Sequence, residues 1–150
     1  MSFLKPRPKR RRSFWNRPLK PVGTVYLPRK LLEDIRAHAA EVAPEECVGL
    51  LLGQPERVDR VVRLKNVSQT PQTRFFADPQ ALFAALKEAD ARGEQLLGSY
   101  HSHPHSDAFP SSTDLTGAHE GAVQLISGRD AERVFRLQDG VVTELELKLQ

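Results

Sequence analysis

The sequence predicts an α/β fold: one domain in which a mixed β-sheet is flanked by helices and ends in a β-hairpin. Strand-like and helix-like segments alternate along the 150 residues, a length that can close a single hydrophobic core. The continuous apolar run CVGLLLG, residues 47–53, is typical of a buried central strand. Near the end, ERVFRLQDGVVTELELKL contains two strand-like halves around Asp139-Gly140, a strong hairpin turn signal.

Three segments carry helix signals. From Pro28, PRKLLEDIRAHAAEVA has apolar residues at helical spacing, and proline is tolerated in a first turn. We expect His38 of this helix to face solvent. PQALFAALKEADARG predicts a second amphipathic helix that ends at Gly93, and SSTDLTGAHEG predicts a short third helix.

Four further segments predict the remaining strands. Thr24 to Leu27 forms a short one, and RVDRVVRLKNV is expected to pair antiparallel with the buried apolar run. EQLLGSYHSH predicts a strand that Pro104 ends, and AVQLIS predicts another after the short helix. The sequence therefore indicates one α/β domain without internal repeats.

The charge is unevenly distributed. Residues 1–20 contain eight Lys and Arg, three prolines and no acidic residue. Subtracting them from the 22 basic residues of the chain leaves 14 basic against 19 acidic residues, a net charge of −5. We therefore expect a basic, disordered N-terminal tail over residues 1–22 and a folded domain over residues 23–150. The tail is either an electrostatic arm for a polyanion, with Phe14 and Trp15 available for stacking, or a solubilising extension.

The remaining bulk properties predict a cytoplasmic protein without membrane segments. Cys47 is the one cysteine, which excludes an intrachain disulfide and is typical of a reducing compartment. The longest apolar runs are too short to span a bilayer, and no apolar core follows the basic start as in a signal peptide.

The stretch SYHSHPHSDAFPSSTD, residues 99–114, is the main candidate for chemistry. His101 and His103 are two residues apart at the end of a predicted strand, so their side chains leave the same face. Asp114 would add a carboxylate from the first turn of the next helix. Two histidines and one carboxylate form a known ligand set for catalytic zinc, in which the fourth position is left for water. Tyr100 and Ser102 would point to the opposite face as core or support residues.

Each part of this stretch also has a simpler interpretation. Histidine pairs of this spacing are common in solvated loops, and Ser111 to Asp114 fits a helix capping pattern that requires no chemistry. His105 and His119 lack a partner at ligand spacing and are interpreted as loop or surface residues. The single cysteine excludes a zinc-deaminase motif, and HExxH is absent.

The combined pattern resembles a known family. HSHP, six residues and SSTD give H-x-H-P-x6-S-x-x-D at 101–114, and ECVGLLLG at 46–53 matches E-x-x-G-L-x-x-G. Both are similar to the signature of the JAB/MPN/Mov34 metalloenzymes, also called JAMM or MPN+ proteins. RFFADP and GSYHSHP resemble its compact prokaryotic branch. The resemblance runs from about Thr24 to Ser127 and implies a JAB/MPN, cytidine-deaminase-like fold.

The resemblance also implies roles for five residues. His101, His103 and Asp114 would bind one catalytic zinc ion, which lowers the pKa of its bound water to about 7. Glu46 would take a proton from this water and deliver it to the leaving amine, although a shift of one residue would give that role to Glu45. Ser111 would donate a hydrogen bond to the oxyanion.

These roles imply a zinc metallopeptidase of the JAMM type. We expect it to hydrolyse a peptide or isopeptide bond after the C-terminal Gly-Gly of a ubiquitin-like protein or of a β-grasp sulfur carrier, as a free precursor or as a conjugate. The alternative is a nucleic-acid-associated protein that uses the basic tail, because a branch of the same superfamily linked by name to DNA repair has a similar motif. A catalytically silent scaffold is disfavoured because every ligand position is present.

Overall fold

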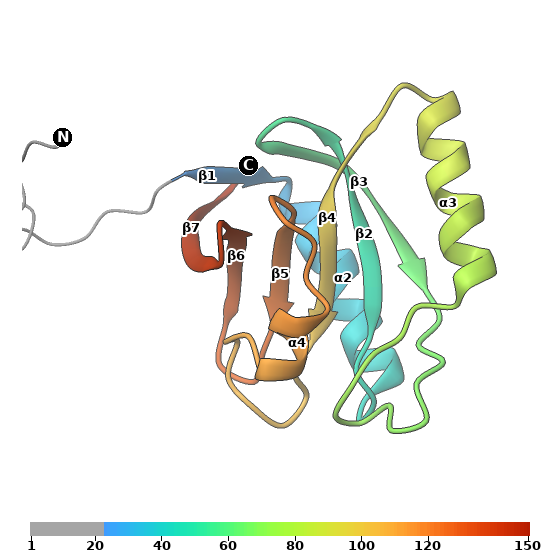
Figure 1. The fold of residues 1–150 in the computed structure, drawn as a ribbon, viewed down its shortest axis with the longest axis vertical. Helices are drawn as coiled ribbons and strands as arrows, with labels where there is room; N and C mark the ends of the chain where they lie inside the picture. The colour runs from blue at the N-terminus through green and yellow to red at the C-terminus, as the bar shows by residue number, and fades with distance from the viewer. Residues whose placement is uncertain (1–22) are drawn as a thin grey trace, which may run out of the picture.

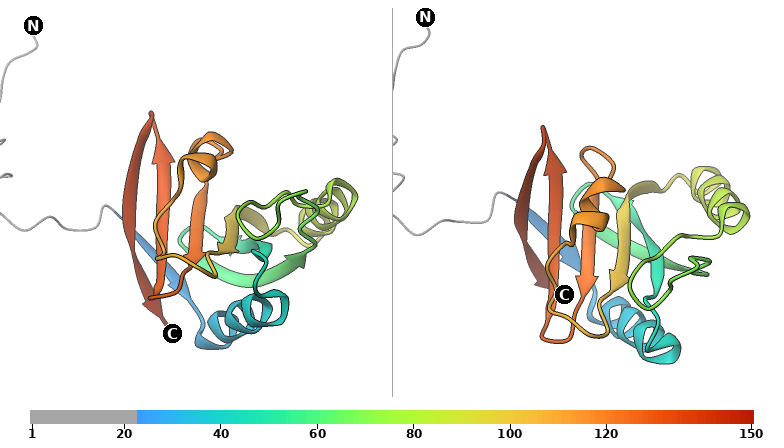
Figure 2. Two further views of the ribbon diagram at one scale, coloured as in Figure 1. Left: turned by 90° about the horizontal axis from the view of Figure 1, so that it is seen from below. Right: turned by 60° about the horizontal axis from the view of Figure 1, so that its bottom comes forward.

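The computed structural model of the chain describes residues 23–150. These residues form strands β1 to β7 and helices α2 to α4 (Figures 1 and 2). The predicted basic tail, its boundary at residue 22 and its proposed contact with nucleic acid lie outside the described residues. Among residues 23–150, no helix is both long enough and apolar enough to cross a membrane.

The strands form one mixed sheet that closes into a barrel in the order β1-β3-β2-β4-β5-β6-β7. Their bounds are β1 Thr24–Leu27, β2 Val48–Gln54, β3 Arg57–Leu64, β4 Gln95–Ser102, β5 Val123–Ser127, β6 Glu132–Gln138 and β7 Val141–Leu149. The predicted mixed sheet, antiparallel β2–β3 pair and final β6–β7 hairpin are confirmed. Asp139 and Gly140 both have positive φ, as a tight hairpin turn requires.

Closure of the barrel depends on β1. This short strand runs parallel to β7 along its whole length and contacts β3 through the single register pair Tyr26↔Arg57. The sequence predicted a mixed sheet but not its closure, because local patterns contain no information on which strands meet at the two edges.

Strand β2 is buried on both faces. Val48, Leu50 and Leu52 pack in the cluster under α3, whereas Leu51 belongs to the main core on the other face. Since successive side chains of a strand point to opposite faces, burial on both sides explains the continuous apolar run seen in the sequence.

The parallel pairing of β4 with β5 determines where the short helix lies. Strands that run parallel cannot be joined by a tight turn, so residues 103–122 cross over between them. This crossover contains α4, Ser112–Thr116, which lies in front of β4 and β5 in Figure 1. The fold thereby brings α4 close to the end of β4.

Two longer helices cover the sheet, as predicted. Helix α2, Arg29–Val42, packs on the main core, and α3, Pro79–Ala91, packs on the second cluster beside β2 (Figures 1 and 2). Asp78 caps the start of α3 by accepting a hydrogen bond from the Ala81 amide.

The expectation that His38 faces solvent is wrong. Its side chain is 5% exposed, and a 2.7 Å hydrogen bond joins its Nδ1 to the hydroxyl of Tyr100. The buried positions of α2 are Leu32, Ile35 and His38, so the histidine continues the buried face at a spacing of three residues. Tyr100 fills the opposite side of the contact, and its ring occupies the space where a side chain on Gly49 would lie. A buried polar pair thus lies inside the apolar core.

We predict that Tyr100→Phe lowers the free energy of unfolding by about 1–3 kcal/mol, because it leaves the buried His38 ring nitrogen without its partner. Urea denaturation of the parent and the variant measures the change. Tyr26→Phe is the matched control, since the Tyr26 hydroxyl makes no hydrogen bond to any residue that the structure describes. An equal loss in both variants would contradict a specific role for the His38–Tyr100 pair.

Candidate metal centre

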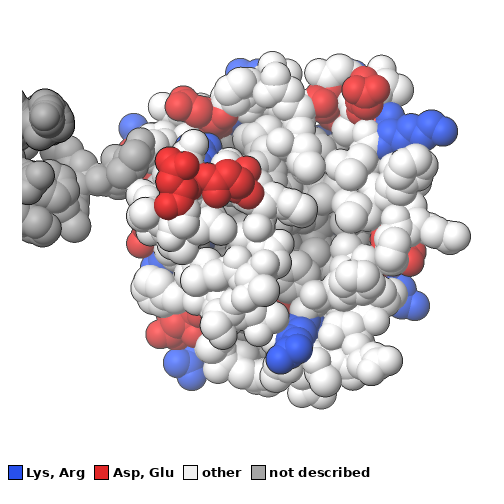
Figure 3. Space-filling view, viewed as in Figure 1, with Lys and Arg blue, Asp and Glu red and all other residues white. Residues whose placement is uncertain are grey.

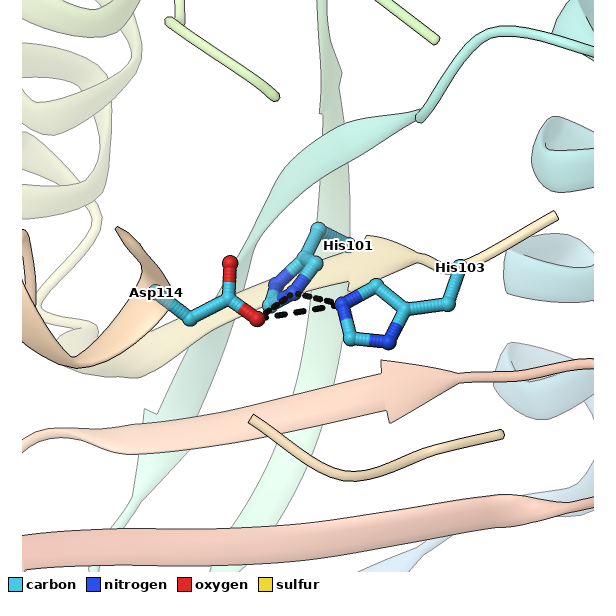
Figure 4. A group of neighbouring side chains, drawn as sticks. All are labelled: His101, His103 and Asp114. Atoms are coloured by element: carbon cyan, nitrogen blue, oxygen red, sulfur yellow. Dashed lines mark hydrogen bonds and ion pairs between the residues drawn. The ribbon is translucent and has the colours of Figure 1, made fainter. Parts of the chain in front are cut away.

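Three side chains converge at the end of β4. His101 is the second-last residue of this strand, His103 follows it, and Asp114 comes from α4 (Figure 4). The His101 and His103 Nε2 atoms lie 3.1 Å and 3.0 Å from the Asp114 Oδ2 atom, and 3.2 Å from each other. All three residues are buried. The structure therefore places the three predicted ligands together.

The spacing of these three atoms fits a small metal ion. In a tetrahedral zinc site with bonds of about 2.0–2.1 Å, neighbouring ligand atoms lie about 3.3 Å apart. The observed separations of 3.0–3.2 Å are close to that edge length. Two imidazoles and one carboxylate also suit zinc, and three protein ligands leave a fourth position open. The donor set and its spacing thus support a zinc site.

A capping box holds the carboxylate in this position. The Asp114 amide donates to the Ser111 hydroxyl, and the Ser111 amide donates to the Asp114 Oδ2 atom at 2.9 Å. This is the same oxygen that faces both histidines. The capping interpretation of S-x-x-D is therefore correct and compatible with metal binding, because the cap orients the ligand atom.

Neighbouring groups orient the two imidazole rings. The His103 Nδ1–H donates to the Asp107 carbonyl at 3.0 Å, which leaves the Nε2 lone pair directed at the site. The His101 ring stacks on Phe75, with ring centroids 4.5 Å apart. Phe75 comes from the loop between β3 and α3, so a segment distant in sequence fixes the ring plane.

The electrostatics keep Asp114 and His101 in the forms that bind metals. Burial alone would raise the pKa of Asp114, but its hydrogen bonds with His101 and His103 outweigh this effect and hold the pKa well below its usual range. Burial lowers the pKa of His101, which favours the neutral imidazole. An ionised carboxylate beside a neutral imidazole is the state in which each can donate a lone pair. For His103, burial alone would lower the pKa, but its hydrogen bonds with Asp114 and the Asp107 carbonyl outweigh this effect and raise it.

Glu46 lies in a cleft beside this cluster. The cleft has a volume of about 170 Å³ and is lined by Glu46, Gln72, Thr73, His103, Pro104, His105, Ser106 and Ser111. Glu46 is 6% exposed, and burial raises its pKa to about 7, close to the value for a general base that works near neutral pH. Glu45 is exposed and does not line the cleft. This difference favours Glu46 over Glu45 as the catalytic carboxylate.

The other residues that the sequence analysis considered lie outside the three-residue cluster. His105 lines the cleft but is exposed and is not part of the metal cluster, and His119 is exposed near α4. Cys47 is buried, and burial raises the pKa of its thiol to about 11, so it is protonated and unreactive as a nucleophile. Sequence reasoning gave no specific role to Phe75 or to the Asp107 carbonyl, because stacking and backbone contacts leave no motif.

Comparison with known proteins identifies the family. The model of the prokaryotic homologues of the JAB domain matches residues 28–138, most of the described chain. The chain therefore belongs to this family of JAB-domain proteins, and the resemblance noted in the sequence is confirmed.

Two curated relatives and one solved structure illustrate the likeness. The probable TtuB-protein conjugate cleaving protease of Thermus thermophilus is 46% identical over 116 residues, which cover 77% of this chain and 78% of the relative. The CysO-cysteine peptidase of Mycobacterium tuberculosis is 33% identical over 135 residues, 81% of this chain and 90% of that one. The solution structure of protein DSY2949 from Desulfitobacterium hafniense matches with a TM-score of 0.74 and 31% identity, over 85% and 93% of the two chains.

We predict that the purified protein binds about one zinc ion per chain and that His101→Ala or Asp114→Ala abolishes this binding. Elemental analysis and competition with a chromogenic chelator measure the stoichiometry and affinity. His105→Ala is the control, since this neighbouring histidine lies outside the cluster of three and its variant should bind zinc as the parent does. Equal zinc binding by the parent and the Asp114→Ala variant would rule out the proposed ligand set.

Proposed function

We propose that the protein is a zinc-dependent peptidase and isopeptidase that hydrolyses the bond after the C-terminal Gly-Gly of a ubiquitin-like or sulfur-carrier protein. The observation that carries the proposal is one cleft lined by the buried Glu46 carboxylate, by Ser111 and by His103, a member of the three-residue cluster. The names of the two curated relatives, a conjugate-cleaving protease and a peptidase, agree with this reaction class.

The three-residue cluster and Glu46 have different roles in the proposed hydrolysis. His101, His103 and Asp114 would hold a zinc ion, which would supply a Lewis acid and make a water molecule acidic enough to lose a proton near neutral pH. Glu46 accepts a proton as the water oxygen bonds to the scissile carbonyl carbon, and delivers it to the leaving amine as the C–N bond breaks. Its raised pKa suits both transfers, because the carboxylate gains and loses the proton with little free-energy difference near neutral pH.

Ser111 stabilises the charge that develops on the scissile carbonyl. Its Oγ accepts the hydrogen bond from the Asp114 amide, so the hydroxyl hydrogen is available as a donor. The residue also lines the same cleft as Glu46. A donor fixed by its own helix cap requires little reorganisation during the reaction, which is the condition for effective oxyanion stabilisation.

An apolar groove leads to the metal centre and fits the end of a protein substrate. It has a volume of about 270 Å³, reaches Asp114, and is lined mainly by apolar residues from β2, the loop after β3, α3, β4 and the segment after α4, including Leu50, Phe75, Leu82, Leu86, Leu96 and Ala118. In Figure 3 this face is mainly uncharged, and most charged side chains lie toward its rim. An extended, uncharged C-terminal tail suits such a groove better than a charged polymer.

We predict that Glu46→Gln lowers kcat by about 100- to 10,000-fold while zinc binding is retained, because the amide cannot accept the proton. The assay uses a ubiquitin-like protein joined through its C-terminal Gly-Gly to a lysine or to a short peptide, with and without chelator. Glu45→Gln is the matched control at the adjacent, exposed position and should keep the parent's activity. A Glu46→Gln enzyme as active as the parent would disprove the assignment of the base.

We predict that Ser111→Ala lowers kcat roughly 100-fold, the usual cost of losing one oxyanion donor. Zinc affinity should change much less, because the Ser111 backbone amide still holds Asp114 Oδ2. Steady-state kinetics and a zinc competition titration separate the two effects. Loss of zinc in proportion to activity would instead show that Ser111 acts only through the helix cap.

A further inference from the structure

Asn66 is the second residue after β3, and its side chain lies between the loop of residues 67–76 and the segment that contains Glu46. The side-chain Nδ2 donates to the carbonyl oxygens of Glu46 and Arg74, each at 3.0 Å, and lies 3.4 Å from that of Pro71. These contacts use both hydrogens of the amide. The donor half of Asn66 therefore connects two chain segments.

The acceptor half of the same side chain organises the loop. The Asn66 Oδ1 atom accepts hydrogen bonds from the backbone amides of Ser68 and Phe76, both at 3.0 Å. Residues near both ends of the loop are thus bound to one oxygen, and a backbone bridge between Asn66 and Ala77 closes its base. With every donor and acceptor of the amide used, the loop has one well-defined arrangement.

The backbone of Glu46 is held from two directions. On the loop side, its amide donates to the Pro71 carbonyl at 2.7 Å and its carbonyl accepts from Asn66. On the strand side, the Cys47 amide donates to the Ser102 hydroxyl at 2.8 Å, and Ser102 lies between the two histidines of the metal cluster. Asn66 therefore makes one of the three hydrogen bonds that hold the backbone of Glu46 and Cys47 in place relative to that cluster.

The Glu46 carboxylate itself has little other support. Its Oε1 atom is buried and has no hydrogen-bond partner among residues 23–150. With one carboxylate oxygen unrestrained, the position of the carboxylate follows mainly from where the backbone at residue 46 is held. A small displacement of that backbone would be transmitted directly to the reacting oxygen.

We propose that Asn66 is a positioning residue that fixes the Glu46 carboxylate relative to the metal ligands through the Glu46 carbonyl. The catalytic consequence rests on the proposed hydrolase function, whereas the positioning itself is a property of the folded chain. The same side chain sets the loop from which Gln72 and Thr73 line the cleft and Phe75 stacks on His101. Asn66 thereby binds both the backbone of Glu46 and the loop that lines the cleft.

The substitution Asn66→Asp tests this role. It keeps an acceptor for the Ser68 and Phe76 amides but replaces the donor with a carboxylate oxygen that faces the Glu46 and Arg74 carbonyls. We expect kcat to fall about 10- to 100-fold, the effect of a misplacement of about 1 Å, with little change in KM. Zinc affinity should equal that of the parent, because Asn66 contacts none of the three ligands and the retained acceptor still binds the Phe76 amide next to Phe75, which stacks on His101.

Two comparisons separate positioning from a general effect. Gln69→Glu adds the same charge to the same loop at an exposed residue that does not line the cleft, and it should leave kcat unchanged. In a Glu46→Gln background, Asn66→Asp should cause no further loss of kcat, since the group that it positions no longer acts. An equal loss in both backgrounds, or a change confined to KM, would overturn the proposal.

Hydrogen exchange tests the positioning without relying on activity. The Glu46 amide should exchange at least about tenfold faster in Asn66→Asp than in the parent, while the Leu51 amide in the core of β2 stays protected. If the parent cleaves no Gly-Gly substrate but this exchange result holds, the proposed function fails and the positioning role stands. Unchanged exchange at Glu46 would overturn that role. If Asn66→Asp does not fold, Asn66→Ser, which also removes the contact with the Glu46 carbonyl, is judged by the same criteria.

Discussion

The parallel pairing of β4 with β5 is the constraint on which the site depends. Two parallel neighbours need a crossover, and here residues 103–122 make it. That segment begins with His103 of the three-residue cluster, passes through the loop whose Asp107 carbonyl orients the ring of His103, and then forms α4 with its capping box. Had β4 and β5 been joined by a tight turn, no chain would return to the end of β4 with a carboxylate.

The capping box shows how one set of hydrogen bonds can serve both folding and chemistry. The four-residue pattern from Ser111 to Asp114 starts a helix of only five residues, too short to be stable by itself. The same bonds direct Asp114 Oδ2 at the two histidines. Binding of a metal ion would in turn stabilise the cap, so we expect the ligand set and this helix to be thermodynamically coupled.

The two faces of the sheet near the site differ in character. On one face, Tyr100 forms its buried hydrogen bond with His38 inside the main core. On the other, His101 belongs to the three-residue cluster and Glu46 lines the neighbouring cleft, and burial lowers the pKa of His101 but raises that of Glu46. Ser102 accepts a hydrogen bond from the amide of Cys47, the residue that follows Glu46. The apolar face holds the sheet rigid. On the polar face, the low dielectric of the protein interior shifts the pKa values of the buried side chains.

The sequence by itself determined the elements, the mixed sheet and the residues proposed for catalysis. The period of apolar residues is local, and the joint spacing of HSHP, SSTD and the upstream glutamate is specific enough to indicate a family. It also predicted the cap at Ser111, although not that the capping carboxylate oxygen is the one that faces the histidines.

Only the tertiary structure decided the closure of the barrel by β1, the burial of His38 and the burial of Glu46 beside an exposed Glu45. Each depends on which distant segments meet. The five hydrogen-bond contacts of Asn66 are a further case, because four of its five partners are backbone groups in the surrounding loop and the fifth is twenty residues upstream. Backbone groups are the same at every residue, so no sequence pattern marks such a contact before the chain is folded.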